Sequence, residues 1–244
     1  MFSSTANFKS QVFWLPPLLL FGAVWALRPV ETRLIAAPAT QSAELAKLGG
    51  SGLIGVFGGM RAAVAGGFWL RTNQAWERQD AAGTTALLQL TVVADERPLY
   101  FWLNGARMLA YDIPTWSATA EQPVAVQRKT AAAGVAAAQG FLAAGLRVHP
   151  GSPELLIELG NIQLRAGGDR AAAAELFRRA AEQPGAPYFA ARIHGELLRE
   201  LGRPQQALDW LRKILPGLPA HDPAARRDVV EQRIKALEEQ LGQN

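Results

Sequence analysis

PELLIELGNIQLRAGGDRAAAAELFRRAAEQPGAPYFAARIHGELLRELGRPQQALDWLRKILPGLPAH, residues 153–221, is the stretch that decides the fold. It contains two copies of one pattern, in which apolar residues at helical spacing surround a small residue, Gly160 in the first copy and Gly195 in the second. A break rich in glycine or polar residues follows each of them, at 167–169 and at 201–203. The pattern therefore predicts two consecutive pairs of helices.

The two copies resemble the tetratricopeptide repeat, whose period is about 34 residues. Leu159-Gly160 matches the Leu-Gly pair of the family's first helix, and Pro219 matches its closing proline. Ala173 and Ala207, which are one such period apart, stand at a small-residue position of the second helix, and the first copy carries one extra residue near its turn. The resemblance implies a right-handed α-solenoid of stacked helical pairs with an extended concave face. Such a surface binds partners and rarely performs chemistry.

The composition agrees with an all-α fold, because long alanine runs and many Leu, Arg, Glu and Gln residues favour helices. The chain has 244 residues, 49% of them hydrophobic and 19% charged, which allows a sizeable core. The net charge of +4 comes entirely from residues 1–150 but forms no basic run, so no nucleic-acid partner is expected. Cysteine is absent, which excludes disulfides, thiolate metal sites and a cysteine nucleophile.

An uncharged apolar segment, Val12–Leu27 (residues 12–27), stands near the N-terminus. As a helix it would span about 24 Å, slightly less than a bilayer core of roughly 30 Å. We expect a single-pass signal anchor in a bacterial cytoplasmic membrane, with the bulk of the chain on the periplasmic side. A cleaved signal peptide, with small residues at Ala37–Ala39, and a buried or amphipathic helix of a soluble protein are the alternatives.

Counting back from the two clear repeats predicts further helical pairs upstream, about four pairs in all. Helices are expected at about 67–80 and 84–95, then at Leu99–Tyr111, with Asp112-Ile-Pro114 ending that helix, and at about 123–148. The expected organisation is an anchor segment at 1–35, a linker at 36–52, divergent repeats at 53–150, two repeats at 151–222 and a capping helix at 223–244. The capping helix has one narrow apolar stripe, Val230, Ile234, Leu237 and Leu241.

No constellation of residues points to catalysis. The histidines are His149, His194 and His221, and none has another histidine or a carboxylate placed to share a metal ion. A packed, hydrogen-bonded role is expected for His194. No Gly-x-Ser-x-Gly elbow or phosphate-binding loop exists, and the Gly-x-Gly-x-x-Gly match at 50–55 follows no predicted strand. We therefore expect no enzyme activity, no cofactor, no metal and no small-molecule substrate.

The resemblance implies that the concave face is lined from the first helix of each pair. Carried over onto this chain, the expected protein-binding residues are Phe68, Arg71, Arg78, Tyr100, Arg107, Tyr111, Asn161, Arg165, Arg192 and Arg199. Arginine offers planar bidentate donors to carboxylates, and aromatic rings offer rigid apolar contact, so an acidic peptide or helix fits as the partner. The alternative is that these arginines form ion pairs inside the repeats with Glu77, Glu196 and Glu200.

These observations lead to the hypothesis of a non-catalytic, membrane-tethered scaffold that binds another protein within a larger assembly. The alternative is a permanent structural subunit of a membrane complex, with its groove filled.

Overall fold

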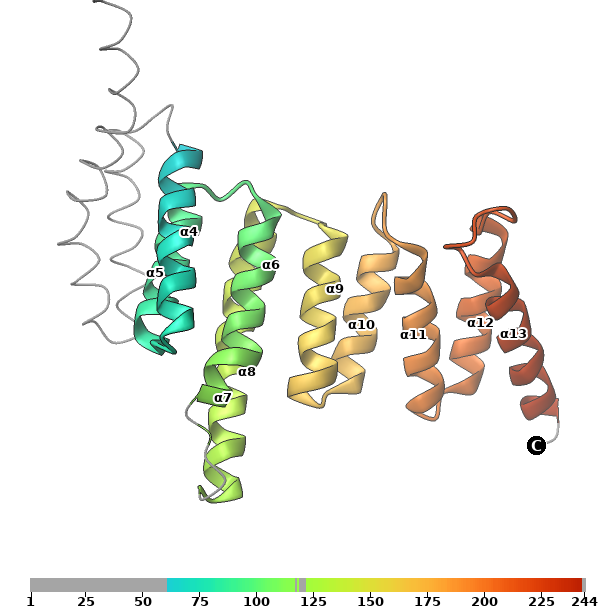
Figure 1. Ribbon diagram of the computed structural model, residues 1–244. Coiled ribbons are helices and arrows are strands. Elements are labelled where there is room, and N and C mark those ends of the chain that lie inside the picture. The colour runs from blue at the N-terminus through green and yellow to red at the C-terminus, as the bar shows by residue number, and fades with distance from the viewer. Residues whose placement is uncertain (1–60, 117, 119–121, 243–244) are drawn as a thin grey trace, which may run out of the picture. The chain divides into compact units, whose positions relative to one another are not determined.

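The computed structural model describes residues 61–242 apart from 117 and 119–121 (Figure 1). Every regular element in these residues is a helix, so the predicted all-α class is confirmed for them. The predicted anchor at 12–27 and linker at 36–52 lie outside the described residues. The chain divides into two compact units at Phe101/Trp102; we call the described parts unit 1 (61–101) and unit 2 (102–242).

Unit 1 is a helical hairpin of α4 (Arg61–Glu77) and α5 (Ala81–Ala94), followed by the first residues of α6 (Leu99–Arg107). The Asp80 carboxylate accepts a hydrogen bond from the Gly83 N–H at 2.9 Å and caps α5. The break between the helices therefore lies before residue 81, whereas the sequence analysis placed it at 81–83. The difference arises because the Asp80 cap allows α5 to begin at Ala81, and Ala81 and Ala82 do not by themselves mark the start of a helix.

The core of unit 1 combines small side chains with large ones. Ala65 and Ala86, 0% and 2% exposed, allow α4 and α5 to approach closely. Phe68, Leu87 and Leu90 fill the space around them. Burial of such a face stabilises the hairpin by about 25 cal/mol for each Å² of apolar surface removed from water.

Unit 2 begins with a helix that is longer than predicted. After α6 the chain continues through a π-helical turn, η1 (Met108–Asp112), into α7 (Ile113–Trp116). The expectation that the helix ends at Asp112-Ile-Pro114 is wrong. The π-turn has already shifted the hydrogen-bond ladder, since the Ile113 N–H reaches back to the Met108 carbonyl. The proline then stands in the first turn of α7, where a missing N–H costs little.

The next helix, α8 (Val124–Val148), packs against η1, α7 and α9. Its Gly145 lies against Trp102, which also contacts Phe141 at 4.8 Å between ring centroids. Of the described helices, α8 alone is long and apolar enough to cross a membrane by length and composition, and 33% of that apolar window is buried. A buried helix of a water-soluble protein meets the same criteria.

The rest of unit 2 is a series of helices in which each one contacts the next along the chain (Figure 1). In order, the elements are α9 (Pro153–Ile162), η2 (Gln163–Gly167), α10 (Arg170–Ala181), α11 (Tyr188–Glu200), α12 (Pro204–Ile214), η3 (Leu215–Gly217) and α13 (Arg227–Gly242). Three residues of the predicted apolar stripe of α13, Val230, Ile234 and Leu237, are buried against neighbouring helices and at most 9% exposed, while Leu241 is partly buried.

The turns between these helices recur at the spacing of the sequence repeat. Gly168 follows η2 and Gly202 lies just after α11, with φ of 68° and 71°. Gly151 and Gly185 stand in the turns that precede the pairs, with φ of 75° and 74°. In each of these two sets the second glycine follows the first by one repeat period. A left-handed backbone at each position explains why glycine recurs there.

The extra residue of the first copy lies inside the helix rather than in its turn. Gly168 is the eighth residue after Gly160, whereas Gly202 is the seventh after Gly195. The π-turn η2 occupies this interval in the first copy. A π-turn absorbs one additional residue within a helix, so α9 and α11 can otherwise follow the same course.

Gly160 of α9 and Gly195 of α11 each lie at a close contact with the helix that follows. A Cβ atom on Gly160 would lie 3.0 Å from a ring carbon of Phe177, and one on Gly195 would lie 2.8 Å from a methyl carbon of Leu211. Phe177 and Leu211 are themselves one repeat period apart, and they are 0% and 3% exposed. The same kind of close approach therefore occurs between α9 and α10 and between α11 and α12.

Candidate functional site

A hollow of about 430 Å³ lies between α9–η2 and α11, with part of its lining from α10. Polar and charged residues line it together with apolar ones. Its lining is Asn161, Leu164, Arg165, Arg170, Phe177, Ile193, Glu196, Leu197 and Glu200. It brings together two of the predicted binding residues, Asn161 and Arg165.

A second hollow of about 370 Å³ lies between α11 and α13. Its lining is Arg192, Ile193, Glu196, Leu211, Val229, Val230 and Arg233. Ile193 and Glu196 line both hollows, so the two are adjacent on one side of α11. We call the two hollows together the groove.

Glu196 is held between two arginines in the groove. It accepts hydrogen bonds from Arg199 at 2.5 and 2.9 Å, and Arg233 of α13 approaches its other oxygen at 3.1 Å. The Arg199 hydrogen bonds, followed by the nearby positive charges, lower the pKa of the Glu196 carboxyl. Arg199 thus forms an ion pair within the protein. This is the alternative to partner binding that the sequence analysis named for the predicted arginines.

Arg165 differs from Arg199 in its surroundings. It is exposed and lines the groove, and within residues 61–242 as described it makes no hydrogen bond or ion pair. Asn161, one turn before it, likewise makes no side-chain hydrogen bond to the described part of the chain. Arg165 therefore has its five N–H donors directed to solvent or to a partner.

Two other predicted arginines hold helices together. Arg107 of α6 donates to Glu158 of α9 at 2.6 Å, and Glu158 is only 4% exposed. Arg192 donates to the carbonyl oxygens of Ala224 and Ala225 at 3.1 and 2.9 Å and so secures the segment that leads into α13. Both contacts satisfy polar groups that would otherwise be costly to bury.

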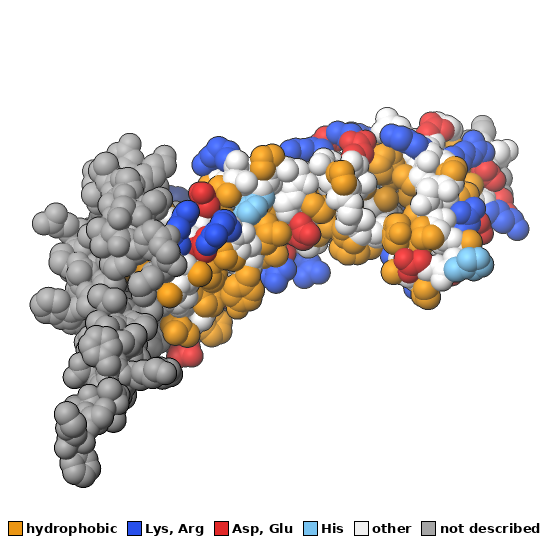
Figure 2. Space-filling view, turned by 90° about the horizontal axis from the view of Figure 1, so that it is seen from above, with side chains coloured by type: hydrophobic (Ala, Val, Ile, Leu, Met, Phe, Trp, Pro, Cys, Tyr) orange, Lys and Arg blue, Asp and Glu red, His pale blue; other side chains and the backbone are white. Residues whose placement is uncertain are grey.

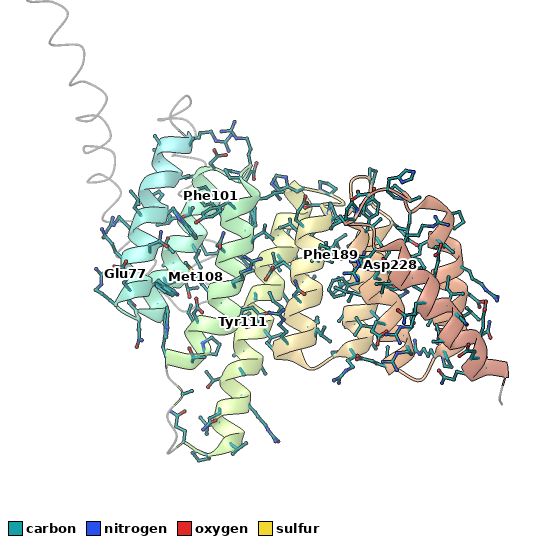
Figure 3. All side chains as sticks on the ribbon, turned by 45° about the vertical axis from the view of Figure 1, so that its right-hand side comes forward. Glu77, Phe101, Met108, Tyr111, Phe189 and Asp228 are labelled. Atoms are coloured by element: carbon teal, nitrogen blue, oxygen red, sulfur yellow. The ribbon has the colours of Figure 1, made fainter. Side chains whose placement is uncertain are left out.

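Tyr111, labelled in Figure 3, lies on the π-turn η1 and is partly buried. Burial, and next the negative charge of Glu158, raise the pKa of its hydroxyl, while Arg165 and Arg107 act in the opposite direction. The tyrosine therefore stays neutral and can act as a hydrogen-bond donor near the two arginines.

The remaining predicted residues belong to unit 1. Phe68 is 2% exposed and contributes to the core, while Arg71 is partly buried. Arg78 and Tyr100 are exposed. Unit 1 is described by itself, and the groove consists entirely of side chains from the other unit.

One hollow was not anticipated from the sequence. About 450 Å³ in volume, it lies between α10 and α12, with His194, Leu198 and Trp210 among its lining residues. The His194 Nδ1 lies 2.7 Å from the Ala174 carbonyl oxygen, and the ring meets Trp210 edge to face at 4.7 Å. The expected packed, hydrogen-bonded role of His194 is confirmed, and burial lowers its pKa.

Among the described residues, no group of three or more His, Asp or Glu side chains is arranged to hold a metal ion. On the face seen in Figure 2, basic and acidic side chains are interspersed, without a continuous basic area. No protein-family model matches the chain, and no curated protein is significantly similar to it.

Proposed function

We propose that unit 2 is a right-handed α-solenoid of the tetratricopeptide-repeat type and that its groove binds another protein. The observation that carries the proposal is the periodic recurrence of left-handed turn glycines, together with the same glycine contact in two consecutive pairs. Helical pairs that repeat in this way leave the first helix of each pair lining one side. On this proposal, the groove along α9, α11 and α13 is the concave side.

The lining of the groove favours a partner with acidic character. Four arginines, Arg165, Arg170, Arg192 and Arg233, and two glutamates, Glu196 and Glu200, line its two hollows. Both glutamates already face arginines, at 3.1 Å or less for Glu196 and at 3.3 Å between Glu200 and Arg170. An approaching carboxylate therefore meets an excess of positive charge, and Arg165 can bind it with two parallel hydrogen bonds.

Apolar groove residues would add contact area beside the charged ones. Leu164 and Ile193 are partly exposed in the groove, next to Asn161. An amphipathic segment could place apolar side chains on them while its carboxylates reach Arg165. The arrangement suits reversible recognition, because the charges at the rim remain hydrated until the partner arrives.

We propose further that the segment at 12–27 tethers the protein to a bacterial cytoplasmic membrane, with the groove on the periplasmic side. Support for the tether comes from the uninterrupted uncharged, mostly apolar composition of that segment and from Trp14 and Trp25 near its ends, and the side of the membrane follows the usual topology of a signal anchor. We propose that the protein is a non-catalytic scaffold. Its tether would concentrate the bound partner at the membrane surface.

The groove can be tested by crosslinking in cells. Because the chain has no cysteine, the variant Asn161→Cys carries a single thiol to which a photoreactive group can be attached. We expect it to crosslink one predominant protein, whereas Arg179→Cys, an exposed position on α10 outside the groove, should not.

Affinity for the captured partner provides the second measurement. We expect Arg165→Ala to weaken binding by about tenfold or more, since a charge-assisted hydrogen bond contributes about 1.5 to 3 kcal/mol. The control Arg179→Ala should change binding by less than about twofold, as for most surface residues. Equal crosslinking from both faces, or unchanged affinity in Arg165→Ala, would contradict the proposal.

A further inference from the structure

The hollow between α10 and α12 contains a buried hydrogen-bond acceptor that the fold does not use. His194 lines this hollow and is 6% exposed. Its Nδ1 lies 2.7 Å from the Ala174 carbonyl oxygen, and since a carbonyl oxygen only accepts, Nδ1 carries the proton. Burial lowers the pKa of His194 and so favours the neutral ring, in which Nε2 keeps a free lone pair.

This Nε2 atom opens into the hollow. No described group donates a hydrogen bond to it. It is also not one of the side-chain atoms, among the described residues, that are both sealed from solvent and without a partner. Nε2 is therefore accessible, and the hollow that the ring lines is its access. A buried acceptor of this kind is satisfied by water or by a ligand.

The floor of the hollow around Nε2 is apolar. Ala174, Leu198 and Trp210 line it and are each at most 9% exposed. The indole N–H of Trp210 already donates to the Ala191 carbonyl oxygen at 2.9 Å, so Trp210 offers only ring carbons to a ligand. The floor thus combines apolar surface with one histidine acceptor.

The charged rim of the hollow disfavours a cationic ligand. Its charged residues are Arg178, Arg203, Lys213, Glu175 and Asp209. Glu175 is held by Arg178 at 2.6 Å, and Lys213 lies 5.3 Å from the centre of the Trp210 ring, where a cationic ligand would otherwise bind. Arg203 makes no ion pair or side-chain hydrogen bond to any other described residue. A positively charged group would therefore meet like charges, whereas a neutral group would not.

These features select a ligand that is apolar, neutral and able to donate a hydrogen bond. The hollow of about 450 Å³ is near the lower end of the size range of ligand pockets, which suits a single aromatic group. A phenyl or aliphatic group would leave Nε2 unpaired, at a cost in free energy. A phenol donates through its hydroxyl, and its oxygen can also accept from Arg203 or Lys213, which the nitrogen of an indole cannot do. A tyrosine side chain therefore fits this chemistry better than a tryptophan.

We propose that this hollow binds a tyrosine side chain of a partner protein, whose hydroxyl donates to His194 Nε2 while its ring lies against Leu198 and Trp210. A side chain suits the site because the rim stays in solvent, with the side chains of Glu175 and Lys213 54% and 69% exposed, and leaves room for the partner's backbone outside. The hollow is lined mainly from α10 and α12, whereas the groove is lined mainly from α9, α11 and α13. It is therefore a second surface, and the inference does not depend on the groove.

The test compares p-cresol, which is the side chain of tyrosine, with toluene, which is that of phenylalanine. The full-length protein in detergent, labelled with ¹⁵N in its three histidines, is titrated with each compound, and free concentrations are corrected for partitioning into detergent. We expect p-cresol to shift the Nε2 resonance of His194 and to bind about tenfold or more tightly than toluene, which leaves the acceptor unpaired. His194→Phe should bind the two compounds equally, and the control His221→Phe, at an exposed loop position, should keep the preference.

Two comparisons on the unmodified protein decide the inference even if His194→Phe does not fold. If p-cresol leaves the His194 resonance unchanged or binds no better than toluene, Nε2 does not receive a phenol and the inference is overturned. Tighter binding of 3-methylindole, the side chain of tryptophan, would overturn the assignment to tyrosine.

A peptide distinguishes a partner protein from a free phenol. An acetylated and amidated pentapeptide with tyrosine between glycines should bind at least as tightly as p-cresol, and the same peptide with phenylalanine should bind about tenfold or more weakly. A tyrosine peptide that does not bind, although p-cresol does, would show that the hollow takes a small phenolic compound and would overturn the role of a partner protein.

Discussion

Replacing Gly160 by alanine tests the contact on which the groove depends. The new Cβ would lie 3.0 Å from the nearest ring carbon of Phe177, which is fully buried and cannot move aside easily. Overpacking of this kind costs about 1 to 3 kcal/mol. Alanine regains about 1 kcal/mol of helix propensity relative to glycine. The net expectation is a destabilisation of about 1 kcal/mol.

Two other glycines provide internal controls. Gly140, exposed on α8, has no atom within 4 Å of the added Cβ, so Gly140→Ala should stabilise by about 0.5 to 1 kcal/mol. At Gly195 the added Cβ would lie 2.8 Å from a methyl carbon of Leu211, which is also buried, so Gly195→Ala should destabilise as Gly160→Ala does. Gly160→Ala and Gly140→Ala should therefore differ by about 2 kcal/mol.

Hydrogen exchange of the full-length protein in detergent measures these differences locally. The free energy of opening should fall for amides of α9 and α10 in Gly160→Ala and rise in α8 for Gly140→Ala. Because Asn161 follows Gly160, the first variant should also bind the groove partner more weakly. If Gly160→Ala is stabilised as much as Gly140→Ala, the helices do not approach as described, and the argument for repeated pairs fails.

Two further predictions concern buried polar groups. Burial lowers the pKa of His194, so the unfolded state binds a proton more readily than the folded state as the pH falls below about 6.5. The contribution of neutral His194 to the free energy of unfolding should therefore be complete above that pH and decline below it, at pH values higher than those at which carboxylates are protonated. His194→Gln should remove this part of the pH dependence, as measured by urea unfolding. For the ion pair, Arg107→Met should cost about 1 to 3 kcal/mol, because Glu158 stays buried while half of the arginine side chain is in solvent. The double variant with Glu158→Gln should recover much of that loss in the same assay, and additive losses would show that the two groups are not coupled.

Much of the local structure of unit 2 could be predicted from the sequence. Helices follow from runs of alanine and leucine, and the turn glycines at 168 and 202 mark left-handed residues that few other amino acids adopt readily. The apolar stripe of α13 also predicted which side would be buried. These features depend on residues close together in the chain, so pattern alone is informative.

The helix that continues through Pro114 shows where local signals fail. A proline normally ends a helix, and the residue before it avoids helical geometry. Here the π-turn at Met108–Asp112 and the packing of α8 against it stabilise a continuation, and Gly134 of α8 leaves room for the Pro114 ring. A contact between residues twenty positions apart carries no signature in the local pattern.

Sequence alone therefore determined the helical class and the regular spacing of the turns, since both follow from side-chain type and order. Of the ten binding residues that the resemblance implied, Asn161, Arg165 and Arg192 line the groove, and Phe68 lies in the core of unit 1. Only the tertiary structure decided what each arginine does. Arg107 and Arg199 are bound to glutamates, Arg192 is bound to backbone carbonyls, and Arg165 faces the groove. The physical reason is that the role of an arginine depends on which acceptor groups folding brings within about 3 Å of its guanidinium. These groups come from other helices or from an adjacent turn of the same helix.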